Sequence, residues 1–233
     1  MNYQSLREQV CQINKDIVKA GLVVLTFGNA SGADRQAGVM AIKPSGVDYD
    51  ALTPDDIVVL SLADGKVLAG NKRPSSDTAT HLHLYQNFPN VGGIVHTHSV
   101  QATAWAQAHR EIPCFGTTHA DHCHGPVPVT RPLTAAEIKG DYELNTGKVI
   151  VERFTKRKLN PDHVPGVLVA GHAPFVWGPT PAKALENAIA FEAMAEMATL
   201  TLAIRPSTKP IPRVLLDKHF LRKHGPKAYY GQQ

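Results

Sequence analysis

The stretch Gly92-Gly93-Ile94-Val95-His96-Thr97-His98-Ser99 decides how the rest of this 233-residue chain is interpreted. Its apolar pair Ile94-Val95 has glycines before it and a polar break after it, which is typical of the end of a buried strand. Side chains at positions i and i+2 of a strand point to the same face, so His96 and His98 should send both imidazoles into one space. Because neutral imidazole is the commonest metal-binding side chain, the stretch predicts half of a metal site.

Two further ligands would have to come from elsewhere in the chain. The best candidates are Asp77, which ends Pro74-Ser75-Ser76-Asp77, and His172, which ends Val169-Ala170-Gly171-His172. Three histidines and one carboxylate suit Zn²⁺ and are also compatible with Mn²⁺ or Co²⁺. The alternative is that His96 and His98 are partly buried and hydrogen-bonded to backbone. A His-x-His pair alone does not favour a metal site over this alternative.

Composition and charge exclude several classes of protein. Hydrophobic residues make up 43% of the chain, enough for a sizeable core, and the net charge of +4 is too small and scattered to indicate nucleic-acid binding. The basic stretch 218–227 is interpreted as a solvated helix face or an anionic-substrate contact. No apolar run approaches the ~18–20 residues of a membrane span, and the charges within 1–16 argue against a signal peptide. Cys11, Cys114 and Cys123 lack Cys-x-x-Cys spacing, which indicates free thiols and a cytoplasmic protein.

The hydrophobic pattern predicts strands and helices that alternate irregularly along the chain. Helices are expected at 6–20, 78–88, 101–109, 181–202 and 215–223, with a short one inside 134–154 followed by the apolar piece 149–151. Strands are expected at 22–26, 39–42, 57–62, 66–68, 93–98, 167–169 and 174–177, while 27–32 and 112–129 are expected to be loops. This order favours one α/β domain, residues 1–233, with a mixed or antiparallel sheet flanked by helices over a doubly wound parallel sheet.

Three polar loops next to predicted elements share small residues, hydroxyls and backbone donors. They are Gly28-Asn29, Lys43-Pro44-Ser45-Gly46 and Ser75-Ser76. A phosphate or carboxylate needs close backbone approach, several donors and a compact positive charge, and together the loops supply all three. Each loop alone is ordinary turn chemistry, and Ser76 or Asp77 could equally be the N-cap of the next helix.

Proton carriers complete the expected chemistry, because a metal-bound carbonyl acidifies its neighbours. Asp121 lies in the histidine-rich segment 119–124, and Tyr229 and Tyr230 lie near the chain end. From the residues alone, a turn aspartate and packed tyrosine rings are the commoner roles. A second metal cluster in segment 119–124 is disfavoured, because no regular element fixes the spacing of its histidines.

Taken together, these motifs resemble the class II aldolase and adducin-like family. The segments that carry the resemblance span nearly the whole chain and are 26–31, 43–49, 72–78, 92–99, 116–121 and 216–230. The resemblance implies a central, mainly antiparallel sheet between helices. It also implies a fourfold-symmetric (C4) homotetramer with sites at subunit borders, and it places the C-terminal helix and tail, about 213–233, at such a border.

The resemblance also implies roles for single residues. It implies a divalent metal, usually zinc, held by Asp77, His96, His98 and His172. It implies substrate-phosphate contacts from Asn29, Lys43, Ser45, Gly46, Ser75 and Ser76. It implies acid and base roles for Asp121 and Tyr230, with His219 and Arg222 contributing from a neighbouring subunit. The local sequence His122-Cys123-His124 departs from the family pattern, where larger aromatic residues are expected.

The implied activity is metal-dependent epimerisation of a phosphorylated ketopentose, interconverting L-ribulose 5-phosphate and D-xylulose 5-phosphate in carbohydrate metabolism such as arabinose catabolism. Carbon 4 is not next to the carbonyl, so it is inverted by cleaving and re-forming the C3–C4 bond rather than by abstracting a proton. One alternative is a class II aldolase acting on a related sugar phosphate, although family aldolases tend to carry Glu at the position of Asp77. The other is a metal-free, adducin-like binding module, which has no need of the ligand set.

Overall fold

The computed structural model describes residues 3–226 and 228–229. Its strands are β1 (Gly28–Asp34), β2 (Val39–Ile42), β3 (Val58–Ser61), β4 (Val67–Ala69), β5 (Gly93–Thr97), β6 (Gly166–Leu168) and β7 (Pro174–Gly178). Its α-helices are α1 (Gln4–Lys19), α2 (Thr78–Asn87), α3 (Val100–Gln107), α4 (Thr117–Ala120), α5 (Ala135–Lys139), α6 (Tyr142–Arg157), α7 (Pro181–Ile204) and α8 (Arg213–His224). A 3₁₀ turn, Pro54–Asp56, precedes β3. The strands pair antiparallel in the order β4-β3-β2-β1-β5-β7-β6, which confirms the predicted sheet type.

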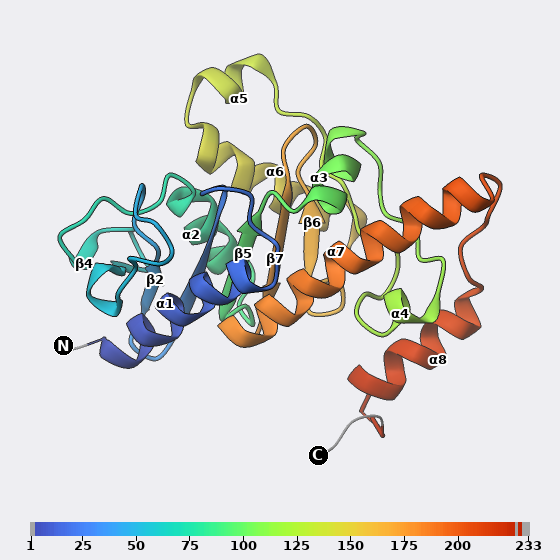
Figure 1. The fold of residues 1–233 in the computed structure, drawn as a ribbon, viewed down its shortest axis with the longest axis horizontal. Coiled ribbons are helices and arrows are strands. Elements are labelled where there is room, and N and C mark those ends of the chain that lie inside the picture. Colours follow the sequence, from blue (N-terminus) through green and yellow to red (C-terminus); the bar gives the residue numbers. More distant parts are fainter. Residues whose placement is uncertain (1–2, 227, 230–233) are drawn as a thin grey trace.

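Helices cover both faces of this sheet (Figure 1). Helices α1, α3 and α7 pack together over one face, and α2 and α6 pack together on the other. The short α4 and the C-terminal α8 pack against each other at one end of the molecule, beside the C-terminal half of α7. Helix α8 is therefore held away from the middle of the sheet.

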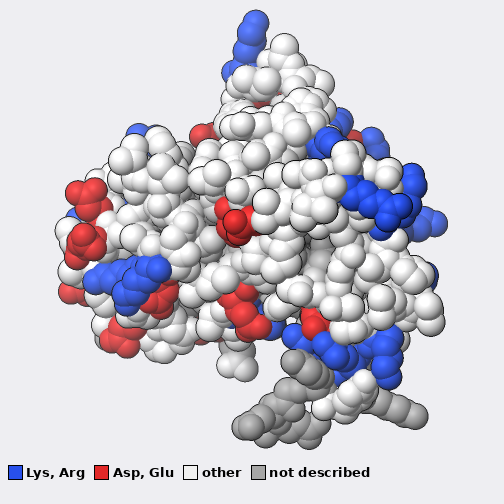
Figure 2. Space-filling view, turned by 45° about the vertical axis from the view of Figure 1, so that its right-hand side comes forward, with Lys and Arg blue, Asp and Glu red and all other residues white. Residues whose placement is uncertain are grey.

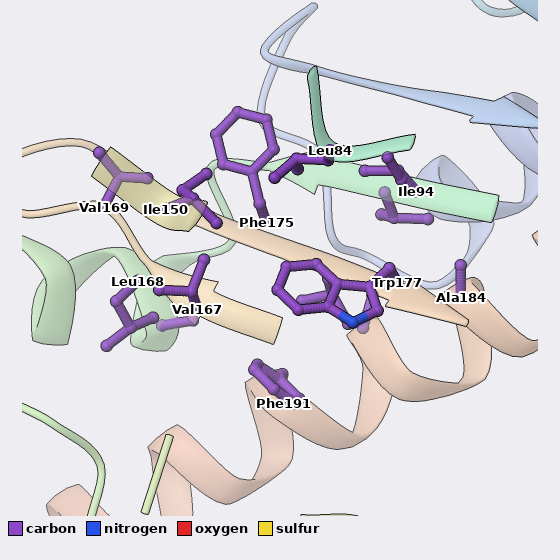
Figure 3. Close-up of a cluster of buried hydrophobic side chains, with 14 of the residues drawn as sticks. Leu84, Ile94, Ile150, Val167, Leu168, Val169, Phe175, Trp177, Ala184 and Phe191 are labelled. Carbon is purple, nitrogen blue, oxygen red and sulfur yellow. The ribbon is translucent and has the colours of Figure 1, made fainter. Parts of the chain in front are cut away.

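The largest buried side chains surround β5 and β7. Figure 3 shows Phe175 and Trp177 of β7 packed with Ile94 of β5 and with Leu84 and Ile150 from the helices on that face. All five are at most 1% exposed. Burial of this size stabilises a fold by roughly 1.5–3 kcal/mol per large side chain. The strand predicted to carry two metal ligands is therefore one of the most firmly held elements of the fold.

The predicted strand 22–26 is wrong, and the predicted loop 27–32 is the central strand β1. In the first segment Leu25 is 79% exposed with a φ of 54°, so its apolar residues do not form a pairing strand. The Gly-, Ala- and Ser-rich sequence of β1 reflects close packing instead. A Cβ on Gly32 would lie 2.9 Å from the ring of Pro181 and 3.0 Å from Val10, because α7 and α1 rest directly on this strand.

The apolar piece 149–151 is also not a separate element, since it lies inside α6. The buried residues of that helix, among them Thr146, Val149, Ile150 and Phe154, recur with helical spacing. A short β-branched run looks the same in a strand and in a buried helix face, which explains the error. Segment 112–129 is largely irregular as predicted but contains α4.

Helix α7 is long and apolar enough to cross a membrane by length and composition alone. Its buried residues Phe191, Met194 and Ala195 instead join the hydrophobic core beneath the sheet. Met197, Leu200 and Ile204 near its C-terminal end are exposed, at 49%, 55% and 86%. α7 is thus the core helix of this fold, with an apolar stripe left open on the single chain.

Candidate active site

One cavity of about 500 Å³ brings together all the residues predicted to hold the metal and all the polar-loop residues. It lies where β5 ends, β1 begins and the β6–β7 hairpin turns. The predicted residues in its wall are Asn29, Lys43, Ser45, Gly46, Ser75, Ser76, Asp77, His96, His98 and His172. Segments up to 143 residues apart in sequence, from position 29 to position 172, thus share one hollow.

Three imidazoles face one another in this cavity. His96 is the penultimate residue of β5, His98 directly follows the strand, and His172 lies in the turn between β6 and β7. The nitrogens that could ligate a metal all lie within 4.8 Å of one another. The Nδ1 of His96 donates to the carbonyl of Pro174 at 2.9 Å, because a carbonyl can only accept. This leaves its Nε2 unprotonated, as a metal ligand must be.

Packing fixes the directions of these rings. The His96 ring stacks on Phe175 with centroids 4.0 Å apart and planes 10° from parallel. Beyond His98 the chain enters α3, whose first free N–H groups at Gln101 and Ala102 donate to the Glu192 carboxylate of α7. Gly171 adopts a φ of 71°, a conformation that favours glycine, and so permits the turn that presents His172.

Asp77 adds a carboxylate to the same cavity, beside the three imidazoles that share metal-binding spacing. Asp77 is the N-cap residue of α2, and its Oδ2 accepts from Asn29 Nδ2 at 2.7 Å. Burial raises the pKa of Asp77, but His96, His81 and the hydrogen bond from Asn29 lower it, with a net shift below the ordinary value. The carboxyl group is therefore ionised at neutral pH.

The surroundings keep His172 and His98 neutral. Burial, assisted by the neighbouring His96 and His98, lowers the pKa of His172 to about 4. Burial also lowers the pKa of His98. Neutral imidazoles expose the lone pairs that a metal requires, so this donor set of three nitrogens and one charged carboxylate fits a divalent cation.

The polar loops line the same cavity and are tied to each other. The backbone N–H of Ser45 donates to the carbonyl of Arg73 at 3.0 Å, and that of Ser75 donates to the carbonyl of Lys43 at 3.0 Å. Two segments that are remote in sequence are thus joined as one short ribbon. Their serine residues share the cavity wall with the imidazoles.

Lys43 places a buried ammonium in this wall, with the residue only 4% exposed. Its Nζ donates to the carbonyl of Val47 and lies 4.7 Å from the centre of the Tyr49 ring. Burial lowers the pKa of Lys43, an effect that Asp48 opposes. The Tyr49 hydroxyl in turn donates to the carbonyl of Gly28 at 2.6 Å, which joins the lysine loop to the start of β1.

Asp121, one of the two predicted acid and base residues, lies elsewhere. Asp121 accepts from Arg222 Nη2 at 2.8 Å and lies 3.0 Å from His219 Nδ1, with Lys223 Nζ at 3.7 Å, all within one chain. None of these residues lines the described cavity. Burial raises the pKa of Asp121, but Arg222 and His219 bring it below its ordinary value. Figure 2 shows lysine and arginine side chains gathered at this lower end of the molecule, with acidic atoms among them. Tyr230 lies outside the described residues.

Two histidines of segment 119–124, His119 and His124, have structural partners. His119 Nε2 donates to the carbonyl of Gly125 at 2.8 Å, and His124 lies 2.7 Å from the Asp217 carboxylate. Within the described part of the chain, the three cavity imidazoles are the group with metal-binding spacing.

Four cavity residues were missed by sequence reasoning. They are Thr26, Phe27, Tyr142 and Glu143, and the Tyr142 hydroxyl lies 3.4 Å from Nδ1 of His172. The latter two begin α6, after a break between two helices, and nothing in that local sequence marks a site. Only the folding of α6 against α2 brings them to the cavity.

Comparison with known proteins places these features in context. The model of the class II aldolase and adducin N-terminal domain matches residues 8–199. L-ribulose-5-phosphate 4-epimerase UlaF of Salmonella paratyphi C is 53% identical over 230 residues, covering 99% of this chain and all of the relative. The protein of the same name from Salmonella typhi matches to the same extent.

Solved structures agree in fold. An L-fuculose 1-phosphate aldolase superposes with a TM-score of 0.79 at 25% identity, covering 94% of this chain and 96% of the other. YgbL of Escherichia coli, described as a putative aldolase/epimerase/decarboxylase, gives 0.73 at 25% identity, covering 92% and 97%.

Proposed function

This chain belongs to the class II aldolase and adducin family, and from that premise we propose that it is an L-ribulose-5-phosphate 4-epimerase. It interconverts L-ribulose 5-phosphate and D-xylulose 5-phosphate. The observation that carries this proposal is a full-length likeness to relatives of that name, joined to one cavity that is lined both by the donor set and by the polar loops.

The cavity residues take roles that follow from their chemistry. Asp77, His96, His98 and His172 hold a divalent metal, zinc being the best match and Mn²⁺ or Co²⁺ being compatible. When bound, this cation supplies Lewis acidity that stabilises negative charge on substrate oxygens. The substrate phosphate binds Lys43 and the donors of Ser45, Gly46, Ser75 and Ser76, where charge-assisted bonds are strongest. Asn29, whose amide donates a hydrogen bond to Asp77, lines the same cavity as the metal ligands and the phosphate-binding residues.

The reaction inverts carbon 4 by breaking and re-forming a carbon–carbon bond. A base removes the proton of the carbon 4 hydroxyl, the C3–C4 bond breaks, and glycolaldehyde phosphate and the enediolate of dihydroxyacetone result. The phosphate loops retain the aldehyde fragment while it turns its other face, after which the bond re-forms and the proton returns to the new hydroxyl. Attack on two faces requires proton carriers on two sides, which we assign to Asp121 and Tyr230.

Asp121 must then act in a cavity other than that of its own chain. It is tied to His219 and Arg222 of α8, and these three residues lie outside the cavity of the same subunit. A C4 homotetramer, in which the segment 213–233 lies at a subunit border, would present this cluster to the neighbouring cavity. The exposed apolar stripe of α7 and Val214 of α8, 76% exposed, supply surface for such a contact. The three buried free cysteines accord with a cytoplasmic protein.

The direct test is incubation of the purified protein with L-ribulose 5-phosphate in the presence of zinc. D-xylulose 5-phosphate should accumulate to equilibrium without net release of glycolaldehyde phosphate. The second candidate is an aldolase acting on a related sugar phosphate, which the superposition with an L-fuculose 1-phosphate aldolase favours. Accumulation of the free two-carbon and three-carbon fragments would support that candidate and contradict the epimerase.

A further inference from the structure

A chain of three buried polar side chains runs behind the cavity without lining it. Ser31 of β1 lies between His81 and Tyr85 of α2, with its Oγ 2.7 Å from His81 Nδ1 and 2.8 Å from the Tyr85 hydroxyl. All three residues are at most 1% exposed. The remaining ring nitrogen, His81 Nε2, is buried and has no hydrogen-bond partner among the described residues.

The direction of these hydrogen bonds follows from counting donors. If the Tyr85 hydroxyl donates to Ser31 Oγ, Ser31 donates in turn to His81 Nδ1, which must then be unprotonated. The reverse direction would leave the Tyr85 proton without an acceptor as well as His81 Nε2 without a donor. Since each buried unsatisfied group carries a desolvation penalty, the first direction is preferred and the proton of His81 is on Nε2.

The unpartnered Nε2–H belongs to a neutral ring close to Asp77. Burial lowers the pKa of His81 to about 3, so the ring is uncharged at neutral pH. Asp77 raises this pKa and His96 lowers it, which places the ring within electrostatic reach of both. His81 is one helical turn beyond Asp77, and its ring contacts Phe175, the residue on which His96 stacks.

A second buried atom without a partner lies beside the same carboxylate. Asn29 donates through Nδ2 to Asp77, and its Oδ1 is buried and unbonded. Asn29 and Ser31 are two residues apart on β1 and so point to one face, opposite Asp77 and His81 on α2. Both residues that carry an unused buried atom interact with Asp77, Asn29 through a hydrogen bond and His81 electrostatically. Buried waters occupy such positions when they find two to four polar partners.

We propose that His81 is a positioning residue for Asp77. Its Nε2–H donates to one buried water, and that water donates to Asn29 Oδ1 and to the Asp77 carboxylate. The arrangement satisfies both unpartnered atoms and fixes the carboxylate in the direction of the three imidazoles. The inference rests on the proposed function, because it treats Asp77 as a metal ligand.

The tautomer of His81 is tested without any substitution in the measured protein. In ¹⁵N-histidine NMR spectra of the metal-free wild-type protein, the His81 ring should be neutral, protonated on Nε2 and unprotonated on Nδ1. The spectrum of His81→Gln identifies the resonance by its loss. A proton on Nδ1, or a charged ring at neutral pH, would overturn the proposal.

Zinc affinity tests the link to Asp77. Removing a group that orients a metal ligand typically weakens binding 10–100-fold, so His81→Leu should bind zinc weaker by about that factor in a chelator competition. His81→Gln should retain most of the zinc affinity, because its amide N–H reaches the position of Nε2. His81→Asn reproduces only the Nδ1 side and should therefore bind zinc more weakly than His81→Gln. His83→Gln, two residues along the same helix and outside the hydrogen-bonded chain, serves as the control and should bind like wild type.

The outcomes separate this inference from the proposed function. Failure of the wild-type protein to bind zinc contradicts the proposed metal site itself. Wild-type zinc binding matched by a folded His81→Leu contradicts only the role of His81. If circular dichroism shows that His81→Leu is unfolded, the Gln and Asn variants decide, and equal zinc affinities for these two would overturn the proposal.

Discussion

At the scale of single residues, the site depends on side chains that are already hydrogen-bonded to other residues of the protein. His96 donates from Nδ1 to Pro174, Asp77 accepts from Asn29, and Lys43 donates to Val47. Each partner leaves one defined atom or charge directed to the cavity. Such preorganisation means that substitution of one residue should change one function rather than the whole fold.

His96→Asn tests the metal site. The amide cannot replace both the bond to Pro174 and the ligating Nε2, so bound zinc and epimerase activity should both fall to near background. Elemental analysis of the purified variant measures the metal, and circular dichroism should show an intact fold. His83→Asn is the control. Full zinc occupancy in His96→Asn would remove this residue from the ligand set.

Lys43→Met tests the phosphate loops. Loss of a charge-assisted contact worth roughly 1.5–3 kcal/mol should raise KM for L-ribulose 5-phosphate by about one to two orders of magnitude. Zinc content should stay unchanged, because the contacts of the ammonium are to Val47 and Tyr49 rather than to the predicted metal ligands. Steady-state kinetics gives the answer, with Lys66→Met in the exposed hairpin as control. An unchanged kcat/KM would place the phosphate elsewhere.

At the scale of elements, the site depends on how closely α7 and β7 pass β5. The first turn of α7 begins at Pro181, directly over Gly93, where a Cβ would lie 2.4 Å from the Pro181 Cα. This contact is with backbone, which cannot move aside as a flexible side chain can. The glycines before the His-x-His segment therefore allow α7 to pack directly over β5, the strand that carries the ligands.

Gly93→Ala should accordingly destabilise the protein by ~1–3 kcal/mol, the usual range for overpacking a core. Urea denaturation of the metal-free protein measures the change. Gly116→Ala is the matched control, because a Cβ there meets no atom within 4 Å, and its effect should be much smaller. Equal stabilities for the two variants would show that α7 shifts to accommodate the methyl group.

At the scale of the whole molecule, buried neutral histidines should make stability depend on pH. Burial lowers the pKa of His119 and His172 to about 4 and that of His81 to about 3. Between pH 4 and the ordinary histidine pKa of about 6.5, the unfolded chain binds protons that the folded chain does not. Unfolding free energy should therefore fall as the pH is lowered through this window.

Each such histidine contributes a slope of up to about 1.4 kcal/mol per pH unit. Urea denaturation of the metal-free protein between pH 7.5 and pH 4.5 measures it. His119→Gln lies away from the metal site and should show a shallower slope than wild type. Identical slopes would mean that His119 is protonated in the folded state.

The subunit-border proposal also belongs to this scale. His96→Asn and Asp121→Asn subunits should each be inactive alone. After dissociation and joint reassembly, some sites combine an intact His96 from one chain with an intact Asp121 from its neighbour. Random mixing into a cyclic tetramer would restore about a quarter of the sites. Verified mixed oligomers that stay inactive would place both residues in the site of one chain.

Local patterns in the sequence determined a large part of this protein. Strand alternation brought His96 and His98 to one face, and loop chemistry selected Lys43 and Ser45, because both depend on neighbours within a few residues. Most helices and the antiparallel sheet followed from the same periodicities. These features could be predicted from the sequence because they depend only on the local backbone geometry.

Only the tertiary structure decided which distant side chains meet. The small residues of β1 are a strand because α1 and α7 press on them, which no local pattern indicates. Asp121 lies with His219 and Arg222, 98 and 101 residues away, rather than in the cavity of its own chain. Ser31 and His81, 50 residues apart, form a buried hydrogen bond for the same reason. Such contacts depend on how whole elements pack, and side-chain spacing along one element carries no information about that packing.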